Sequence, residues 1–270
     1  MESLSTELSI YGSMLLLAII QGLSEFLPVS SSGHLALGQM ILGVGKESLT
    51  AVVVLHAGTL VAVLVYYRKV IAELAGGVFQ GGGDVDGLSA RSYVGMLVLG
   101  NVPAAILGLG FRDQIEGLFA NPWAVFAAML ATAAVLWSTR SCVPGVQAPD
   151  ARRALLIGCA QALAILPGAS RSGWTIAVAL WLGLRPEAAA RFSFLLSIPA
   201  IFGALLLEVL DHDGLDMPVG ALLAGFVVAA LTGLFALRWL VALVRRMELF
   251  RFAIYLCILT TVGVGVLLLR

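Results

Sequence analysis

The chain alternates long apolar segments with short polar interruptions. Six apolar segments have close to the ~20 residues that a helix needs to cross a bilayer. These segments are Thr50–Tyr67, Ser92–Gly110, Pro122–Ser138, Phe192–Leu210, Pro218–Val244 and Leu249–Leu269. The pattern predicts an all-α integral membrane protein with six transmembrane helices.

Four further apolar segments are too short to span. They are Ile10–Ile20, Leu35–Gly45, Ala154–Leu166 and Trp174–Leu184. Helices of this length rise roughly 17–20 Å, less than a hydrocarbon core of about 30 Å. We therefore expect two re-entrant helix–loop–helix hairpins, whose loops are tolerated at membrane depth only where protein or a wet cavity surrounds them.

The two polar stretches between these short segments resemble each other. Residues 21–34 and 161–174 both run through a glutamine, a proline, a serine-rich loop and a glycine, and Gln21 and Gln161 lie 140 positions apart. Each half of the chain then holds one hairpin and three spans. Because three is odd, the second half is inverted relative to the first. The sequence predicts a single membrane domain, 1–270, with inverted repeats at 1–138 and 152–270.

Composition agrees with lipid as the solvent. The chain is 60% hydrophobic and 12% charged, whereas soluble domains carry about 25% charge. A net charge of zero and the absence of a basic stripe argue against nucleic acid as a partner.

The basic residues predict the orientation. One predicted side receives most of them, including Arg68, Lys69, Arg91, Arg140, Arg152, Arg153, Arg185, Arg191, Arg245, Arg246 and Arg251; the other receives Lys46, Arg112 and Arg270. The positive-inside rule makes the first side cytoplasmic. The first hairpin would then open to the outer side and the second to the inner side.

The first loop carries groups suited to acid–base and metal chemistry. Gln21 and Glu25 share one helical face because they are four residues apart. A single carboxylate suits Mg²⁺ or Ca²⁺ shared with substrate phosphates, so Glu25 is the candidate metal ligand. Beyond it, Ser30, Ser31 and Ser32 offer hydroxyls, Gly33 allows close backbone approach, and His34 is a candidate base, acid or nucleophile.

The second loop carries the cation. Arg171 offers a fork of donors suited to phosphate oxygens. The other candidate substrate-binding residues of this loop are Gly168, Ser170, Ser172, Gly173 and Thr175. Acid–base groups in one loop and a cation in the other favour one asymmetric phosphoryl site over two transport sites. The structural alternative is a plain Glu25–Arg171 ion pair, and we interpret His56 as a hydrogen-bonded packing residue.

At these residues the sequence resembles the undecaprenyl pyrophosphate phosphatase, or bacitracin-resistance, family. The likeness covers Gln21–Glu25, then F-L-P-V-S-S-S-G-H over 26–34 and P-G-A-S-R-S-G-W-T over 167–175, and continues at 56–64, 191–199 and 235–240. Gln21 stands where the family often has glutamate, and His56 where glutamine is common.

The resemblance implies a multi-pass hydrolase of the bacterial inner membrane. Such an enzyme converts undecaprenyl diphosphate to undecaprenyl phosphate and inorganic phosphate, which recycles the peptidoglycan lipid carrier and gives bacitracin resistance. A divalent cation, a site open to the periplasmic side and a homodimer are also implied. The rival hypothesis is a lipid-carrier flippase or another inverted-repeat transporter, because broken helices in inverted repeats are typical of transporters.

The attacking group has three candidates. Ser31 attacks with His34 as its base, His34 attacks directly, or His34 activates water; the first is favoured because the two residues lie three apart on a turn. Glu25 and Arg171 complete the predicted catalytic set.

Overall fold

The computed structural model describes residues 2–35, 49–119, 121–143, 145–146, 148–210 and 217–269. Its helices are α1 (Glu2–Phe26), α3 (Leu49–Tyr66), α4 (Arg68–Gln80), α5 (Ala90–Gly110), α6 (Arg112–Phe119), α7 (Pro122–Ser138), α8 (Ala151–Leu163), α9 (Arg171–Trp181), α10 (Pro186–Leu210), α11 (Val219–Arg245) and α12 (Phe250–Leu268). Residues 31–35 are also helical, and Thr139–Ser141 form a 3₁₀ turn. The strands β1 (Asp84–Val85) and β2 (Leu88–Ser89) pair antiparallel.

The helices confirm an integral membrane protein. Within the described residues, α5, α7, α10, α11 and α12 are long and apolar enough to span, and α3 with α4 makes a sixth candidate that is bent by 73°. Large apolar side chains such as Val98, Ile106 and Leu231 are more than 60% exposed, as expected of surfaces that face lipid.

Several boundaries differ from the prediction, among them the start of α10, which begins at Pro186 instead of Phe192. The predicted span Thr50–Tyr67 does not end at charged Arg68 but breaks at Tyr67 and continues as α4. Helix α1 runs on to Phe26 instead of ending near Ile20, and α6 was not predicted. The predicted half-helix Leu35–Gly45 lies almost wholly outside the described residues.

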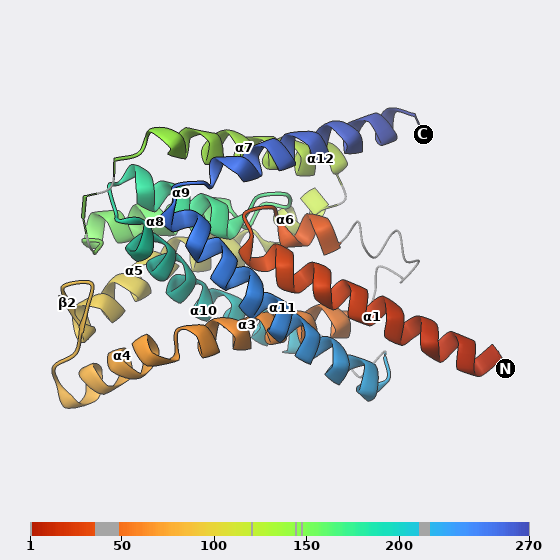
Figure 1. Cartoon of the computed structure of the whole chain (residues 1–270), viewed down its shortest axis with the longest axis horizontal. Helices are drawn as coiled ribbons and strands as arrows, with labels where there is room; N and C mark the ends of the chain where they lie inside the picture. Colours follow the sequence, from red (N-terminus) through yellow and green to blue (C-terminus); the bar gives the residue numbers. More distant parts are fainter. Residues whose placement is uncertain are drawn as a thin grey trace.

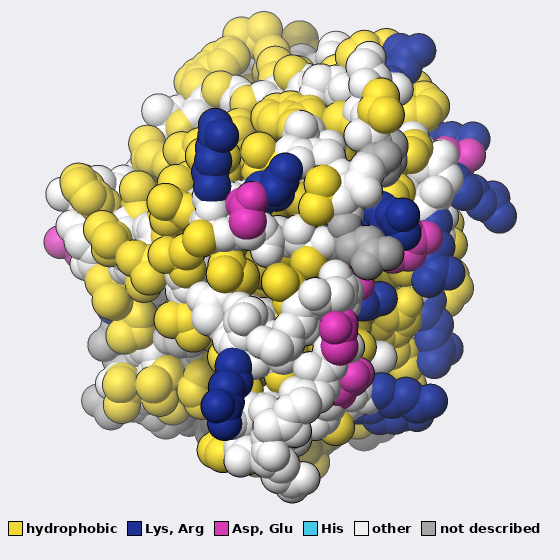
Figure 2. All heavy atoms as spheres, turned by 90° about the vertical axis from the view of Figure 1, so that its left-hand side faces the viewer, with side chains coloured by type: hydrophobic (Ala, Val, Ile, Leu, Met, Phe, Trp, Pro, Cys, Tyr) yellow, Lys and Arg dark blue, Asp and Glu magenta, His cyan; other side chains and the backbone are white. Residues whose placement is uncertain are grey.

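The connections sort to two ends of the molecule. The β-hairpin and the α7–α8, α9–α10 and α11–α12 connections lie at the left in Figure 1, whereas both chain termini lie at the right. The left-hand segments carry Arg91, Arg140, Arg152, Arg185 and Arg246. Figure 2 views this end head-on and shows lysine and arginine side chains across it and gathered along one edge. We call it the basic end.

Close glycine contacts hold the two loop-bearing helices in place. A Cβ on Gly158 of α8 would lie 2.1 Å from the carbonyl oxygen of Gly100 of α5. A Cβ on Gly22 of α1 would lie 1.9 Å from Thr232 Oγ1 of α11. Small residues let membrane helices approach closely, so α1 packs on α11 and α8 packs on α5.

Candidate functional site

The two polar loops are built alike at their tips. Ser30 and Ser170 each precede a helix, and each carbonyl accepts a hydrogen bond from the amide four residues on, at 3.3 and 2.9 Å. The Ser30 hydroxyl lies 3.4 Å from that of Ser32, and the Ser170 hydroxyl lies 3.3 Å from that of Ser172. Equivalent positions in the two loops are therefore 140 residues apart.

The first loop also holds an unusual backbone conformation. Ser30 has a φ of 71°, in the left-handed region that residues other than glycine rarely adopt. Such conformations persist where the surroundings enforce them and are concentrated at functional sites. In the second loop the corresponding freedom comes from Gly168, whose φ is 88° and whose Cβ would lie 2.2 Å from the carbonyl oxygen of Val125.

A buried ion pair joins the loops. Arg171 Nη2 donates to Glu25 Oε1 at 2.6 Å, and the side chains are only 16% and 7% exposed. Gln21 Nε2 donates to Glu25 Oε2 at 3.0 Å. The Ser31 side chain lies near the same carboxylate. Residues that are 146 positions apart in the chain thus form one cluster.

The cluster lines a cavity of 840 Å³, which we call the loop cavity. Of the predicted site residues, it is lined by Glu25, Ser31, Ser32, Ser170 and Arg171. The cavity extends along α5 and α10 to Arg112 and Glu208, where both helices reach the end opposite the basic end. Its walls there are mostly apolar, with Leu109 on α5 and Leu205 on α10.

The remaining predicted residues do not line this cavity. Gln21, Ser172 and Thr175 are buried. Gln21 Nε2 donates to Glu25, and Thr175 Oγ1 is hydrogen-bonded to Ser193 Oγ of α10. The other predicted residues away from the cavity lining are Ser30, Gly33, His34, Gly168 and Gly173.

His34 faces a different neighbour from the one predicted. Its Nδ1 donates to the Ser30 carbonyl at 2.8 Å, and its Nε2 accepts from the Tyr255 hydroxyl of α12 at 2.6 Å. The described hydrogen bonds include none between His34 and Ser31. A role for His34 as the base for Ser31 stays a prediction.

Sequence reasoning missed the contacts that three residues, His56, Gln161 and Asn101, make at the site. His56 Nε2 lies 3.8 Å from Glu25 Oε2 while its Nδ1 donates to the Val52 carbonyl at 2.8 Å, so this histidine both packs and faces the cavity. Gln161 donates to Asn101 Oδ1 at 3.0 Å, which joins α8 to α5. The sequence did contain a signal for these residues. A polar side chain within an apolar segment costs free energy at membrane depth, so each such residue is a candidate functional residue.

Several buried polar atoms at the site have no partner among the described residues. These include Arg171 Nη1, Gln21 Oε1 and Gln161 Oε1. An unpaired buried donor costs about 1–3 kcal/mol, so Arg171 Nη1 favours a bound anion.

These residues do not form a closed metal site. Within the described part of the chain, no three His, Cys, Asp or Glu side chains converge. The carboxylate of Glu25, which lines the cavity, does fit a magnesium or calcium ion that takes its other ligands from phosphate and water.

Together, the fold and the site define a multi-pass helical membrane protein in which two polar loops meet at one cavity that holds a buried ion pair. The sequence matches the family model described as bacitracin resistance protein BacA over residues 14–262, and the chain belongs to that family. It is 45% identical to the undecaprenyl-diphosphatase of Desulfatibacillum aliphaticivorans, over 90% of this chain and 93% of the relative. It is 41% identical to the protein of that name from Korarchaeum cryptofilum, over 94% of this chain and 97% of the relative.

Proposed function

We propose that the chain is an undecaprenyl-diphosphate phosphatase. It hydrolyses undecaprenyl diphosphate with one water to undecaprenyl phosphate and inorganic phosphate, which recycles the peptidoglycan lipid carrier and gives bacitracin resistance. The observation that carries this function is the unpaired, buried Nη1 of Arg171 beside Glu25 in the loop cavity. Curated relatives with this printed name cover nearly the whole chain.

The loop cavity suits both parts of this substrate. The diphosphate binds where Arg171, Ser31 and Ser170 converge, since a guanidinium and hydroxyls are strong donors to phosphate oxygens. The polyprenyl tail leaves along the apolar walls that α5 and α10 provide. Phosphoryl transfer is mainly positioning and charge stabilisation, and these residues supply both.

Glu25, which lines the loop cavity, would hold the divalent cation together with the substrate diphosphate. When bound, such a cation neutralises charge that develops on the phosphoryl oxygens. Glu25 also aligns Arg171 through their 2.6 Å ion pair.

Ser31 is the side chain placed best to attack the terminal phosphorus. It lines the loop cavity and contacts Glu25, whereas both ring nitrogens of His34 are already hydrogen-bonded. Trapping a phosphoenzyme and locating its label tests this assignment. Ser32→Ala is the matched control for Ser31→Ala, because both hydroxyls line the same cavity. Label on a residue other than Ser31 contradicts the assignment. Turnover that persists in Ser31→Ala without any labelled residue contradicts it as well.

The finer architecture is also a proposal: two re-entrant hairpins in an inverted repeat, with the basic end cytoplasmic and the loop cavity opening to the periplasmic side. The matched hydrogen bonds of the two loops at a spacing of 140 residues support the repeat. The first hairpin starts at the end holding the N-terminus and the second starts at the basic end (Figure 1). Labelling of single cysteines from each face of intact cells tests the orientation.

Phosphate release from undecaprenyl diphosphate in detergent tests the function. We expect release by the wild type and its loss in Glu25→Gln, with unchanged folding by thermal denaturation. Lipid movement across proteoliposomes without phosphate release would instead support the transporter hypothesis.

A further inference from the structure

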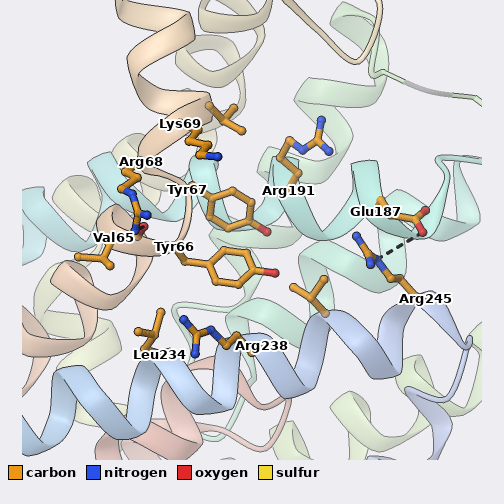
Figure 3. A pocket seen from close by; sticks show the side chains of 12 residues that line it. Val65, Tyr66, Tyr67, Arg68, Lys69, Glu187, Arg191, Leu234, Arg238 and Arg245 are labelled. Atoms are coloured by element: carbon orange, nitrogen blue, oxygen red, sulfur yellow. Dashed lines mark hydrogen bonds and ion pairs between the residues drawn. The ribbon is translucent and has the colours of Figure 1, made fainter.

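A second hollow lies away from the loop cavity and shares no lining residue with it. It has a volume of 410 Å³ and sits where the α3–α4 break, the first turns of α10 and the C-terminal half of α11 meet (Figure 3). Five cations line it: Arg68, Lys69, Arg191, Arg238 and Arg245. We call it the basic pocket.

Carboxylates pair with only two of the five cations of the basic pocket among the described residues. Arg245 Nε lies 3.5 Å from Glu187 Oε1, and Arg191 pairs with Asp86 of the β-hairpin. Within the described part of the chain, Lys69 and Arg238 have no ion-pair or hydrogen-bond partner. Clustered like charges repel one another, so the cluster favours a bound anion.

Neutral donors complete the pocket. Figure 3 shows the Tyr66 and Tyr67 rings side by side, with both hydroxyls directed into the hollow between Arg191 and Arg238. Neither hydroxyl has a described hydrogen-bond partner. Arginine forks and phenolic hydroxyls together match the several oxygens of a phosphate group.

The surroundings point to a lipid. Leu64 and Val65 of α3 are 37% and 40% exposed, and Leu231 and Phe235 of the adjacent α11 are 63% and 61% exposed. Leu64 and Val65 come three to four residues before Arg68, and Leu231 and Phe235 come seven and three residues before Arg238. Half-exposed Trp239 stands beside Arg238, and tryptophan and tyrosine gather at the headgroup level of membranes. A headgroup in the basic pocket would therefore place its acyl chains on an apolar helix surface.

We propose that the basic pocket binds the phosphate-bearing headgroup of an anionic phospholipid in the leaflet at the basic end. Basic pockets between membrane helices bind such headgroups because the local charge adds to the attraction of the leaflet. The site is separate from the loop cavity and does not depend on hydrolysis.

The test is a titration of the purified full chain with short-chain phosphatidylglycerol, read by native mass spectrometry. The pocket variant is Lys69→Gln/Arg238→Gln, and the control is Arg152→Gln/Arg246→Gln, which removes the same charge from exposed positions outside the pocket. We expect roughly 30-fold weaker binding in the pocket variant, since each cation near an anionic lipid contributes about fivefold. The control should bind within about twofold of the wild type.

Two further titrations distinguish the sources of phosphate. Short-chain phosphatidylcholine should bind weakly and equally to all three proteins, because its headgroup has no net charge. Sodium phosphate should fail to displace the phosphatidylglycerol at millimolar concentration. Equal phosphatidylglycerol affinity in the pocket variant and the control overturns the proposal. Displacement of phosphatidylglycerol by millimolar sodium phosphate also overturns it, because the pocket would then bind free phosphate alone. Retained phosphate release and an unchanged unfolding temperature exclude misfolding of the variant.

Discussion

Replacing Arg171 with lysine separates its charge from its geometry. Arg171 Nη2 donates to Glu25 Oε1, and Arg171 Nη1 is buried in the same cluster without a hydrogen-bond partner among the described residues. Lysine has one nitrogen on a shorter reach and cannot hold the carboxylate and a phosphate oxygen in a planar fork. Because the positive charge remains, the buried carboxylate keeps a counter-charge. Arg171→Ala would instead leave Glu25 unpaired at a cost of about 3–5 kcal/mol.

The expected loss follows from removing one buried donor to the developing phosphoryl charge. Such a donor contributes about 2.7–4 kcal/mol, or about 10²–10³ in kcat. The side chains of the pair are 16% and 7% exposed, so water does not screen the interaction as it would on the surface. We expect kcat for undecaprenyl diphosphate to fall by roughly this factor.

The assay is phosphate release in detergent, together with thermal unfolding of each protein. The control is Arg251→Lys, because Arg251 pairs with Glu248 at 3.0 Å with its side chain 62% exposed. Exposed pairs contribute about 0–1 kcal/mol to stability, so the control should match the wild type. A folded Arg171→Lys protein with kcat within about threefold of the wild type would refute a phosphate-binding role.

Three other predictions concern packing, histidine orientation and the cation. Gly158→Ala should destabilise the fold by about 1–3 kcal/mol and lower the unfolding temperature, because its Cβ would lie 2.1 Å from the Gly100 carbonyl oxygen. Gly95→Ala on α5 is the control and should not lower the unfolding temperature, because a Cβ there meets no atom within 4 Å. Equal shifts in the two variants would contradict the close α5–α8 contact. Tyr255→Phe removes the hydroxyl that donates to His34 Nε2, and it should lower kcat by about 2–10-fold and alter the pH–rate profile. An unaltered kcat and pH–rate profile would show that this hydrogen bond has only a structural role. A chelator should abolish phosphate release and added Mg²⁺ or Ca²⁺ should restore it, whereas undiminished release would exclude the shared cation.

Much of the site could be predicted because polar residues at membrane depth are few. Glu25 and Arg171 are two charges within otherwise apolar regions, and each is stable there only with a partner. Their 2.6 Å contact therefore follows from two loops that reach the same depth. The 140-residue spacing of the loops likewise appears in the sequence and again in their hydrogen bonds.

The residues that prediction missed depend on rotation about helix axes. His56 and Tyr255 lie in uniformly apolar helices, where no amphipathic stripe shows which face points inward. Prediction also placed His34 toward Ser31 because sequence spacing cannot show the competing Tyr255 hydroxyl from α12. The break between α3 and α4 at Tyr67 was also missed, because no proline marks it in the sequence.

Each loop is held by a helix from the other half of the chain. Thr132 of α7 accepts from the amide of Ser170 at 3.3 Å and from Trp174 Nε1 at 3.0 Å. Tyr255 of α12 donates to His34 at 2.6 Å, and at the 140-residue spacing His34 corresponds to Trp174. The same loop position thus bonds to the last helix of the opposite half in both cases. The scaffold is therefore matched while the chemistry is not, because Glu25 corresponds to Ile165 and Ser31 to Arg171. An asymmetric site of this kind needs both halves in one cavity, since neither loop alone brings a carboxylate and a guanidinium to the same phosphate.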